Sequence, residues 1–316
     1  MFKKFRGVNK LNIGDLINIK DITGTESKID SYILAGNIHK NIRYDIQNNL
    51  KVGASIYELS ELINKRIRYY TKNKGINGGI AFPPVLSVNN CIAHYSPTRK
   101  TDILLKYEDN VKIDFGVHVN GYMVDSAFST YFDPKLDDIH NICKEALYEG
   151  LKYVGIDGYI KDCSRAIQEV VESHDYEIIK GVNGHSIFRY NVHNGQHIKN
   201  YVKKFDFFNY DRFKEGAYAI EPFISYKNNT YYSKGKGNNY RIKNKDSKMY
   251  KYFNNLIFTD SHVKYYDINN IFQKEKEYLH YYPPLYIKSG DMGVQYEHTV
   301  YISNNKTINI SKGLDF

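Results

Sequence analysis

The 316-residue sequence predicts a mixed α/β fold in which helices cover antiparallel strands. Residues 111–131 have the pattern of a β-hairpin, because apolar residues alternate on both sides of an Asn120-Gly121 turn. Amphipathic helices are expected from Ser55 and again over 159–174. The apolar face of the first helix recurs in the second after 104 residues, which hints at a duplicated α/β unit.

The chain before the hairpin is expected to form two helices and an irregular segment. Isoleucines at helical spacing predict a helix over 29–49, and a capping-box pattern at 55–58 predicts the start of the next helix. We expect a loop over 75–79 and, over 81–97, irregular chain with strand-like pieces. The hairpin then follows.

The chain after the hairpin combines helices and strands. Helices are predicted over about 136–153 and 159–174, with glycines between them. Alternating patterns then predict strands over 216–225 and 292–303. The segment between these strands, 226–285, is rich in Tyr, Asn and Lys and contains a helical pattern, so it is the one plausible inserted subdomain.

Composition excludes several classes of protein. No apolar run approaches the roughly 18 residues of a membrane span, and the basic start of the chain lacks the apolar stretch of a secretory signal. Three widely spaced cysteines fit neither a disulfide framework nor a zinc finger, so we expect a reducing cytosol. The net charge of +9 would suit contact with nucleic acid or a ribosome. Because Lys, Asn, Ile and Tyr are abundant throughout, we interpret this charge as a compositional bias.

Two aspartates of the hairpin fall on one face of the predicted sheet. With Asn120-Gly121 at the tip, Gly116 pairs with Asp125, and Asp114 and Asp125 become diagonal neighbours with Cβ atoms about 7 Å apart. Carboxylates held this close repel one another unless a cation lies between them, and two metal ions about 3.5–4 Å apart would fit. The alternative is that both are solvated residues on the exposed face of a sheet.

Three further residues complete a candidate metal site. The two later strand-like runs carry Glu221 and Glu297, and His185 lies in the sequence Gly184-His185-Ser186. Oxygen-rich ligands with one imidazole suit divalent Mn, Fe, Co or Zn. A lone histidine in such a segment is more often an ordinary loop residue, so the assignment of His185 depends on the other four candidates.

Several separated motifs together resemble one family of metallopeptidases. Their order and spacing are similar to those of type 2 methionine aminopeptidases, and the resemblance runs from about residue 8 to the end of the chain. It implies a pita-bread fold, which is an α/β fold with two pseudo-two-fold αβ halves around a central antiparallel sheet, plus a small helical insert. The matching motifs are NNCIAHYSP (89–97), KIDFGVHVNGYMVDSAFS (112–129), GHSIFRYNVHNG (184–195), YAIEPF (218–223), YPPL (282–285) and QYEHT (295–299).

The resemblance implies a site with two divalent metal ions, Mn, Fe, Co or Zn. Asp114 would bind one ion through both oxygens, and Asp125 and Glu297 would bridge the two ions. His185 and Glu221 would complete the coordination of the second ion. Glu221 would also act as the general base for the attacking water, because the pKa of a glutamate can be raised in such a site.

The resemblance also implies how a substrate would bind. His193 would hydrogen-bond the scissile carbonyl. His94 would lie over the substrate N-terminus, and in this family it is the residue that fumagillin-type epoxides alkylate. Phe82, His94 and Tyr282 would line the pocket for the flexible methionine side chain. Phe188 replaces the glycine that is usual at its position, and we expect it to narrow the pocket or shift the loop.

The expected protein is a monomeric cytoplasmic enzyme that removes the initiator methionine from nascent polypeptides. The type 2 assignment depends on the NNCIAHY motif and on the long connection between Glu221 and Glu297. We expect one catalytic domain, 1–316, with the helical insert 226–285 inside it. Any ribosome contact would come from the catalytic domain, and neither a membrane nor specific DNA is an expected partner.

Two alternatives remain open. Proline-specific peptidases share the fold and the five-ligand pattern, but they normally carry an additional N-terminal domain. Catalytically inactive pita-bread paralogues bind RNA and ribosomal particles, and the basic charge would suit that role. Such paralogues have lost metal ligands, whereas the five ligand positions here hold the required residue types.

Overall fold

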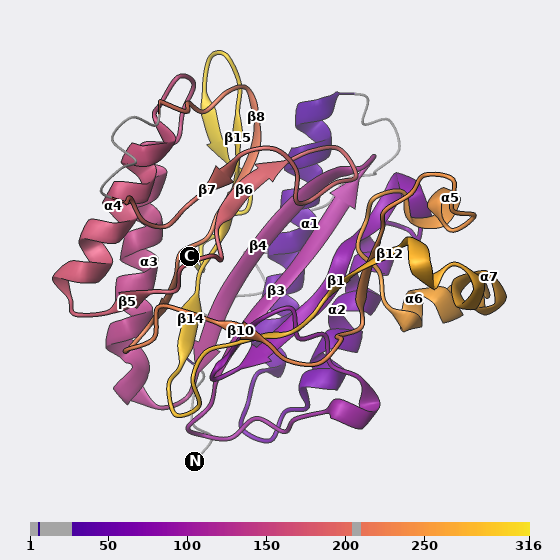
Figure 1. The fold of residues 1–316 in the computed structure, drawn as a ribbon, viewed down its shortest axis with the longest axis horizontal. Coiled ribbons are helices and arrows are strands. Elements are labelled where there is room, and N and C mark those ends of the chain that lie inside the picture. Colours follow the sequence, from indigo (N-terminus) through magenta and orange to yellow (C-terminus); the bar gives the residue numbers. More distant parts are fainter. Residues whose placement is uncertain (1–5, 7–26, 204–209) are drawn as a thin grey trace.

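Helices flank a layer of antiparallel strands on two sides (Figure 1). The computed structural model describes Arg6 and residues 27–203 and 210–316, so the start of the region of resemblance lies outside the described residues. Two helices pack on the first three-stranded sheet, and two others cover the second half of the strand layer. These helices are α1 (Lys28–Asn49), α2 (Ile56–Tyr70), α3 (Asp137–Leu151) and α4 (Ile160–Ser173).

The four predicted helices are confirmed, and so is the recurrence of one apolar face. Ser55 caps α2 by accepting a hydrogen bond from the amide of Glu58 at 3.0 Å. The apolar residues that recur at the same spacing are buried in both α2 and α4, where they face the strand layer. They are Ile56, Leu59, Ile63 and Ile67 in α2, and Ile160, Cys163, Ile167 and Val171 in α4.

The predicted hairpin is confirmed in its register. Its strands are β3 (Asn110–Val119) and β4 (Tyr122–Tyr131). Gly116 lies opposite Asp125, as expected, so Asp114 is the diagonal neighbour of Asp125. Asn120 and Gly121 have φ values of 53° and 80°, which is the backbone that a two-residue type I′ turn requires.

One strand of the first half departs from the predicted pattern. β1 (Gly78–Val88) is a continuous strand paired with β3, where the sequence predicts the end of a loop and then irregular chain with strand-like pieces. Pro83 and Pro84 have no N–H to donate, and the pairing shifts on both sides of Phe82. The predicted loop is shorter than expected, because a 3-10 turn at Gly75–Asn77 leads directly into the strand.

The two predicted strands that carry glutamates are each divided in two. They are β8 (Gly216–Ile220) with β9 (Phe223–Ser225), and β14 (Gly293–Gln295) with β15 (His298–Ile302). β8 pairs with β15 in one sheet, whereas β9 pairs with β14 in another. The chain therefore crosses between the same two sheets at Glu221 and again at Glu297.

The remaining strands of the second half and of the connections are short. They extend the two sheets to the orders β16-β15-β8-β6-β7 and β14-β9-β5, and a third small sheet has the order β10-β13-β2. Their bounds are β2 (Cys91–Ala93), β5 (Glu177–Ile178), β6 (Gly184–Ile187), β7 (His197–Ile198), β10 (Tyr232–Ser233), β13 (Leu285–Tyr286) and β16 (Thr307–Asn309).

Residues 239–282 form a lobe at one side of the molecule (Figure 1). The lobe is built around a hydrophobic cluster of its own. The helical pattern at 248–258 yields a single turn, because Asn254, with a φ of 52°, ends the helix. The division of the chain into a catalytic domain and a subdomain 226–285 stays a prediction. The elements of the lobe are β11 (Asn239–Ile242), α5 (Tyr250–Phe253), α6 (Asp260–Tyr265), α7 (Asn269–Lys274) and β12 (Leu279–Tyr282).

Side-chain hydroxyls join the two halves of the molecule along β4. Ser126 and Ser129 donate hydrogen bonds of 2.6 and 2.8 Å to backbone carbonyls of the β14–β15 segment. Thr299 Oγ1 accepts from the amide of Asp125 at 2.9 Å and donates to the carbonyl of the same residue. We call Ser126, Ser129, Thr299 and their backbone partners the β4 seam.

The described residues agree with two expectations from composition, namely cysteines without a disulfide framework and no membrane span. Cys91, Cys143 and Cys163 are all buried and free. Among the described helices, none has the length and apolar character needed to cross a membrane.

A buried ion pair fixes α1 to the end of the described chain. Two nitrogens of Arg43 donate to the carboxylate of Asp315 at 2.6 and 2.7 Å, and neither side chain is more than 1% exposed. Gln47 donates to the same carboxylate at 2.8 Å, and Arg43 also donates to Ser311 O at 3.0 Å. Removing one partner of such a pair leaves a buried charge without compensation.

We predict that Arg43→Met lowers the free energy of unfolding by about 3–5 kcal/mol, because Asp315 then lies buried without its counter-charge. Urea unfolding followed by circular dichroism measures this change. The control is Lys152→Gln, which removes an exposed pair with Glu149 and should cost less than about 1 kcal/mol. Equal losses in the two variants would contradict this account of the buried pair.

Candidate metal centre

The two hairpin aspartates face one cavity between the halves of the molecule. Asp114 and Asp125 both line this cavity, which has a volume of about 280 Å³. Asp125 is only 4% exposed. The alternative that these aspartates are solvated residues on an open sheet face is therefore wrong.

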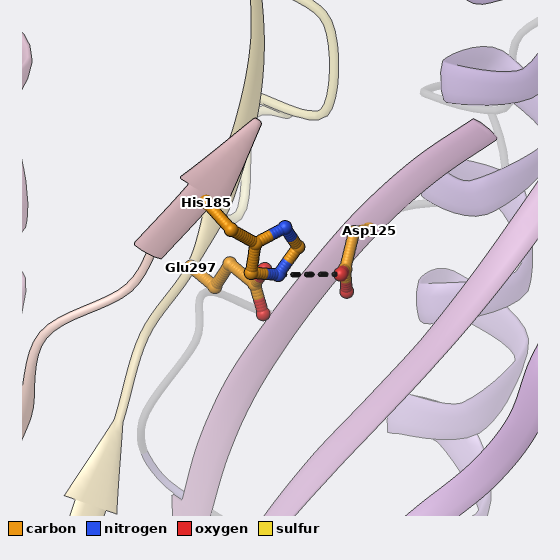
Figure 2. A group of neighbouring side chains, drawn as sticks. All are labelled: Asp125, His185 and Glu297. Carbon is orange, nitrogen blue, oxygen red and sulfur yellow. Dashed lines mark ion pairs between the residues drawn. The ribbon is translucent and has the colours of Figure 1, made fainter. Parts of the chain in front are cut away.

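His185 brings the second half of the molecule to these aspartates. It lies on β6, and its Nε2 atom is 3.5 Å from Asp125 Oδ2 and 3.4 Å from Glu221 Oε1. Ligand atoms of Asp125, His185 and Glu297 all lie within 4.8 Å of one another. Figure 2 shows these three side chains pointing toward a common centre from separate segments of the chain.

The two glutamates reach the same centre from the places where the chain changes sheets. Glu297 is 1% exposed, and its amide donates to Ala127 O at 2.9 Å, which fixes it beside β4. Gln295 Nε2 lies 3.3 Å from one oxygen of Glu221 and 3.3 Å from one oxygen of Glu297. A single amide group therefore links the two carboxylates.

Burial dominates the electrostatics of this centre. It raises the pKa values of Asp114, Glu221 and Glu297 well above their ordinary range, and the neighbouring Asp125 raises each of them further. Hydrogen bonds from Gln295 oppose this rise at Asp114 and Glu221. Four carboxylates in so small a buried space can all ionise at neutral pH only when positive charge lies among them.

The residues present fit a metal ion. Within residues 27–203 and 210–316, no hydrogen-bond donor reaches Asp114 Oδ1 or Glu297 Oε1, although both atoms are buried. The two contacts of His185 Nε2 are longer than ordinary hydrogen bonds of about 2.7–3.2 Å. They match the separation of two ligand atoms that each lie about 2.1 Å from a shared ion. Carboxylate oxygens with one imidazole nitrogen suit divalent transition metals.

All nine site residues predicted from the sequence lie at or beside this cavity. Glu297 is not part of the lining and lies behind it, within hydrogen-bonding reach of Gln295. Their individual roles as ligands, bases or pocket walls stay predictions. The eight predicted residues that line the cavity are Phe82, His94, Asp114, Asp125, His185, His193, Glu221 and Tyr282.

His94 is held in an unusual backbone conformation at the cavity wall. Its φ is 64°, a left-handed value that non-glycine residues rarely adopt. Asn239 Nδ2 donates to His94 O at 3.0 Å, and His94 Nδ1 lies 3.2 Å from Pro283 O. Because a carbonyl can only accept, Nδ1 carries the proton and Nε2 keeps its lone pair. Burial lowers the pKa of His94, which favours this neutral form.

An aromatic wall links the two histidines of the predicted substrate site. The ring of Tyr282 lies 5.7 Å from the rings of both His94 and His193. The ring of His193 is also 4.6 Å from that of His185. Burial, followed by the nearby His185, lowers the pKa of His193 well below its ordinary value, so this side chain is neutral at pH 7.

Two bulky side chains near the cavity have different effects on it. Gly116 leaves space for Phe82, because a Cβ at Gly116 would lie 2.3 Å from the Phe82 ring. A larger residue at this position of β3 would displace Phe82 from the wall. Phe188 is half exposed and is not part of the lining, so it does not narrow the cavity, and the alternative effect, a shift of its loop, stays a prediction.

Sequence reasoning did not single out several residues that shape the centre. Gln295 was part of a matching motif, but its contact with both glutamates was not expected. Its position two residues before Glu297 was the available signal, since alternate residues of a strand share a face. Thr299 follows the same spacing after Glu297, and its hydroxyl holds the backbone of Asp125.

Comparison with known proteins places this centre in a family. The model of metallopeptidase family M24 matches residues 31–304. The chain belongs to metallopeptidase family M24. Methionine aminopeptidase 2 of Komagataella phaffii is 34% identical to it, with 92% of this chain and 71% of that protein covered. The protein of the same name from Sordaria macrospora is 31% identical, with 95% of this chain and 75% of that protein covered. Within the family, the chain thus belongs to the type 2 methionine aminopeptidases.

Solved structures show the same fold. A methionine aminopeptidase from Rickettsia prowazekii superposes with a TM-score of 0.67 at 18% identity, with 94% of this chain and all of that chain covered. A prolidase from Pyrococcus furiosus gives a TM-score of 0.58 at 18% identity, with 91% of this chain and 64% of that chain covered. The predicted pita-bread fold is confirmed.

We predict that Thr299→Val destabilises the protein by about 1–3 kcal/mol, because the buried amide of Asp125 loses its acceptor. Metal affinity should fall about 10- to 100-fold, since the backbone that carries Asp125 is less well fixed. Thermal unfolding and calorimetric metal titration measure the two effects. Thr299→Ser keeps the hydroxyl and is the control. Metal affinity unchanged in Thr299→Val would show that the β4 seam does not position the ligand.

Asp125→Asn should remove metal binding while the protein stays folded. The substitution deletes the charge that raises the pKa values of Asp114, Glu221 and Glu297, so the metal-free protein should be at least as stable as the wild type. Bound metal per chain, measured by elemental analysis after dialysis, should fall to background. A variant that retains the wild-type metal content would exclude Asp125 as a ligand.

Proposed function

We propose that this protein removes the initiator methionine from nascent polypeptides by metal-dependent hydrolysis. The observation that carries the proposal is the convergence of five potential ligands from both halves of the molecule on one cavity with an aromatic wall. Family membership and the identity to methionine aminopeptidase 2 of two fungi support it.

The proposed centre holds two divalent ions, Mn, Fe, Co or Zn. Asp114 would bind one ion, and Asp125 and Glu297 would contribute to both. His185 and Glu221 would complete the coordination of the second ion. When bound, such ions lower the pKa of water toward neutrality and polarise a carbonyl oxygen. The cluster of carboxylates that lacks compensating charge among the described residues supports this assignment.

Glu221 is the proposed general base. Its pKa is raised by burial and then by Asp125 and Asp114, which brings it toward the range where a carboxylate can take a proton from water and later return it to the leaving amine. Gln295 holds one oxygen of Glu221 at 3.3 Å, which leaves the other oxygen directed at His185 and the centre.

His193 and His94 are proposed to act on the substrate itself. A neutral His193 can donate a hydrogen bond to the scissile carbonyl and stabilise the oxyanion of the tetrahedral intermediate. His94 would contact the substrate N-terminus, and its free Nε2 lone pair suits alkylation by fumagillin-type epoxides. The methionine side chain would lie against Phe82, His94 and Tyr282. The second residue of the substrate should be small, because it must pass close to the metals.

The proposed setting is the cytoplasm, with the enzyme acting as a monomer on polypeptides that emerge from the ribosome. Contact with the ribosome itself is part of this proposal. A second candidate function, that of an inactive RNA-binding paralogue, receives less support because all five ligand types are present around the cavity. A proline-specific peptidase is also less supported, since the prolidase resembles this chain in fold alone.

The direct test is release of free methionine from the tripeptide Met-Ala-Ser by metal-free protein to which Mn, Fe, Co or Zn is added. We expect metal-dependent release that a fumagillin-type epoxide blocks. His193→Ala should lower kcat about 10²- to 10³-fold with unchanged metal content, because an oxyanion contact is lost. No release with any metal, together with binding to ribosomal RNA, would overturn the proposal in favour of the inactive paralogue.

A further inference from the structure

One described stretch of the chain is strongly basic. Residues 227–251 contain eight lysines and arginines and one aspartate, so this stretch carries +7 of the net charge of +9. All seven of its lysines are exposed. This stretch is therefore strongly basic and exposed, whereas the interpretation of the net charge as a compositional bias of the whole chain stays a prediction.

The basic stretch runs along the wall of the cavity. Tyr231 and Asn239 both line the cavity, and Lys234 and Lys236 lie on the loop between them. The amide of Lys234 donates to Pro284 O at 3.1 Å. A Cβ at Gly237 would lie 2.5 Å from the backbone oxygen of Tyr282, so the loop contacts the cavity wall closely. The loop is thus fixed beside the residues that form the predicted substrate pocket.

The cavity opens where this loop meets the segment before β6. The exposed residues of its lining are Gly181, His197 and Tyr231, which mark the mouth. Tyr231 lies close against Gly181, since a Cβ at that glycine would be 3.0 Å from the tyrosine ring. Lys180 precedes Gly181, is exposed, and its amide donates to Asn229 O at 2.9 Å. A further lysine therefore lies at this edge of the mouth.

Three lysines near the mouth have no carboxylate within ion-pair distance among the described residues, although Glu177 accepts a hydrogen bond of 3.0 Å from the nearby Asn229. In the part of the chain that the structure describes, Lys180, Lys234 and Lys236 form no ion pair, and the first two lie 5.7 Å from the rings of tyrosines. Arg241, on β11, donates through Nη1 to Asn191 Oδ1 at 3.4 Å. Its Nε atom is buried and has no partner among the described residues.

The charges at the mouth and in the centre are thus opposite in sign. The centre holds four carboxylates, whereas three lysines, Lys180, Lys234 and Lys236, lie on the segments that carry the mouth residues Gly181 and Tyr231. Arg241 lies two residues after Asn239, which lines the cavity. We call these four cations the basic rim. A peptide that places its N-terminal ammonium group at the centre extends outward at about 3.3 Å per residue. We expect the residues after the second to pass the rim as the peptide leaves the cavity.

We propose that the basic rim binds acidic side chains of the substrate polypeptide at positions three to six, so that the enzyme prefers nascent chains with an acidic start. This inference rests on the proposed function. Opposite charges at an open rim act mainly through the rate of association and through KM, and they are screened by salt. RNA is a less suitable occupant, because a nucleic acid bound across the rim would cover the mouth that the substrate must enter.

The test compares hydrolysis of Met-Ala-Ser-Glu-Glu-Glu with that of Met-Ala-Ser-Lys-Lys-Lys by the metal-loaded full chain. At an ionic strength of about 0.05 M we expect kcat/KM to favour the acidic peptide at least about fivefold, mostly through KM, since each exposed pair contributes roughly two- to fivefold. The preference should shrink as the salt concentration rises to about 0.5 M.

Charge-reversal variants assign the effect to the rim. Lys234→Glu with Lys236→Glu should abolish or reverse the preference without changing kcat for Met-Ala-Ser. Lys264→Glu with Lys274→Glu is the matched control, because it makes the same change in net charge on exposed residues of α6 and α7 in the lobe. The control should keep the wild-type preference.

Three outcomes are decisive. Equal kcat/KM values for the two hexapeptides, with normal release of methionine from Met-Ala-Ser, would overturn the proposed role of the basic rim and leave the proposed function intact. A loss of preference in the control variant equal to that in the rim variant would show a general charge effect and also overturn it. Inhibition of all peptides by single-stranded RNA, without any preference between them, would assign the rim to nucleic acid instead.

Discussion

The β4 seam fixes the distance between the two halves of the molecule, and the candidate metal centre depends on that distance. Asp125 belongs to β4, whereas Glu297 belongs to the segment between β14 and β15. Serine and threonine hydroxyls and one backbone hydrogen bond hold these segments side by side. Because every one of these bonds reaches a backbone atom, the ligand side chains stay available for a metal.

The position of the seam also explains why the centre can be so highly charged. Burying four carboxylates together is unfavourable, and the metal-free protein must compensate for it elsewhere. The hydrophobic core along α1, α2, β3 and β4 supplies such compensation. The site is thus a locally destabilising feature held by a rigid frame, which is common at functional sites.

The sequence allowed accurate prediction where one local rule decided the structure. Alternation with a period of two and the Asn120-Gly121 turn determine the hairpin register, so the placement of Asp114 near Asp125 was correct. The sequence indicated only strand-like pieces where β1 lies, because Pro83 and Pro84 interrupt its ladder and hide its period. The breaks at Glu221 and Glu297 were missed because alternation continues across a point where the chain changes sheets, and only tertiary pairing shows the change.

Contacts between distant segments were beyond single-sequence reasoning. Three contacts join residues that only the complete fold brings together. Gln295 contacts Glu221, Thr299 contacts the backbone of Asp125, and Lys234 contacts Pro284. The resemblance to a family identified the five candidate ligands. The structure shows why they suit a metal, since ligand atoms of Asp125, His185 and Glu297 lie within 4.8 Å of one another.

The central claim is that five side chains from the two halves form one metal centre. Anomalous diffraction from crystals of the cobalt-loaded protein tests it most directly. The account predicts two adjacent peaks, each about 2.0–2.2 Å from ligand atoms of the centre. The expected ligands are Asp114, Asp125, His185, Glu221 and Glu297. Peaks only at other sites, in protein that carries a full complement of cobalt, would contradict it.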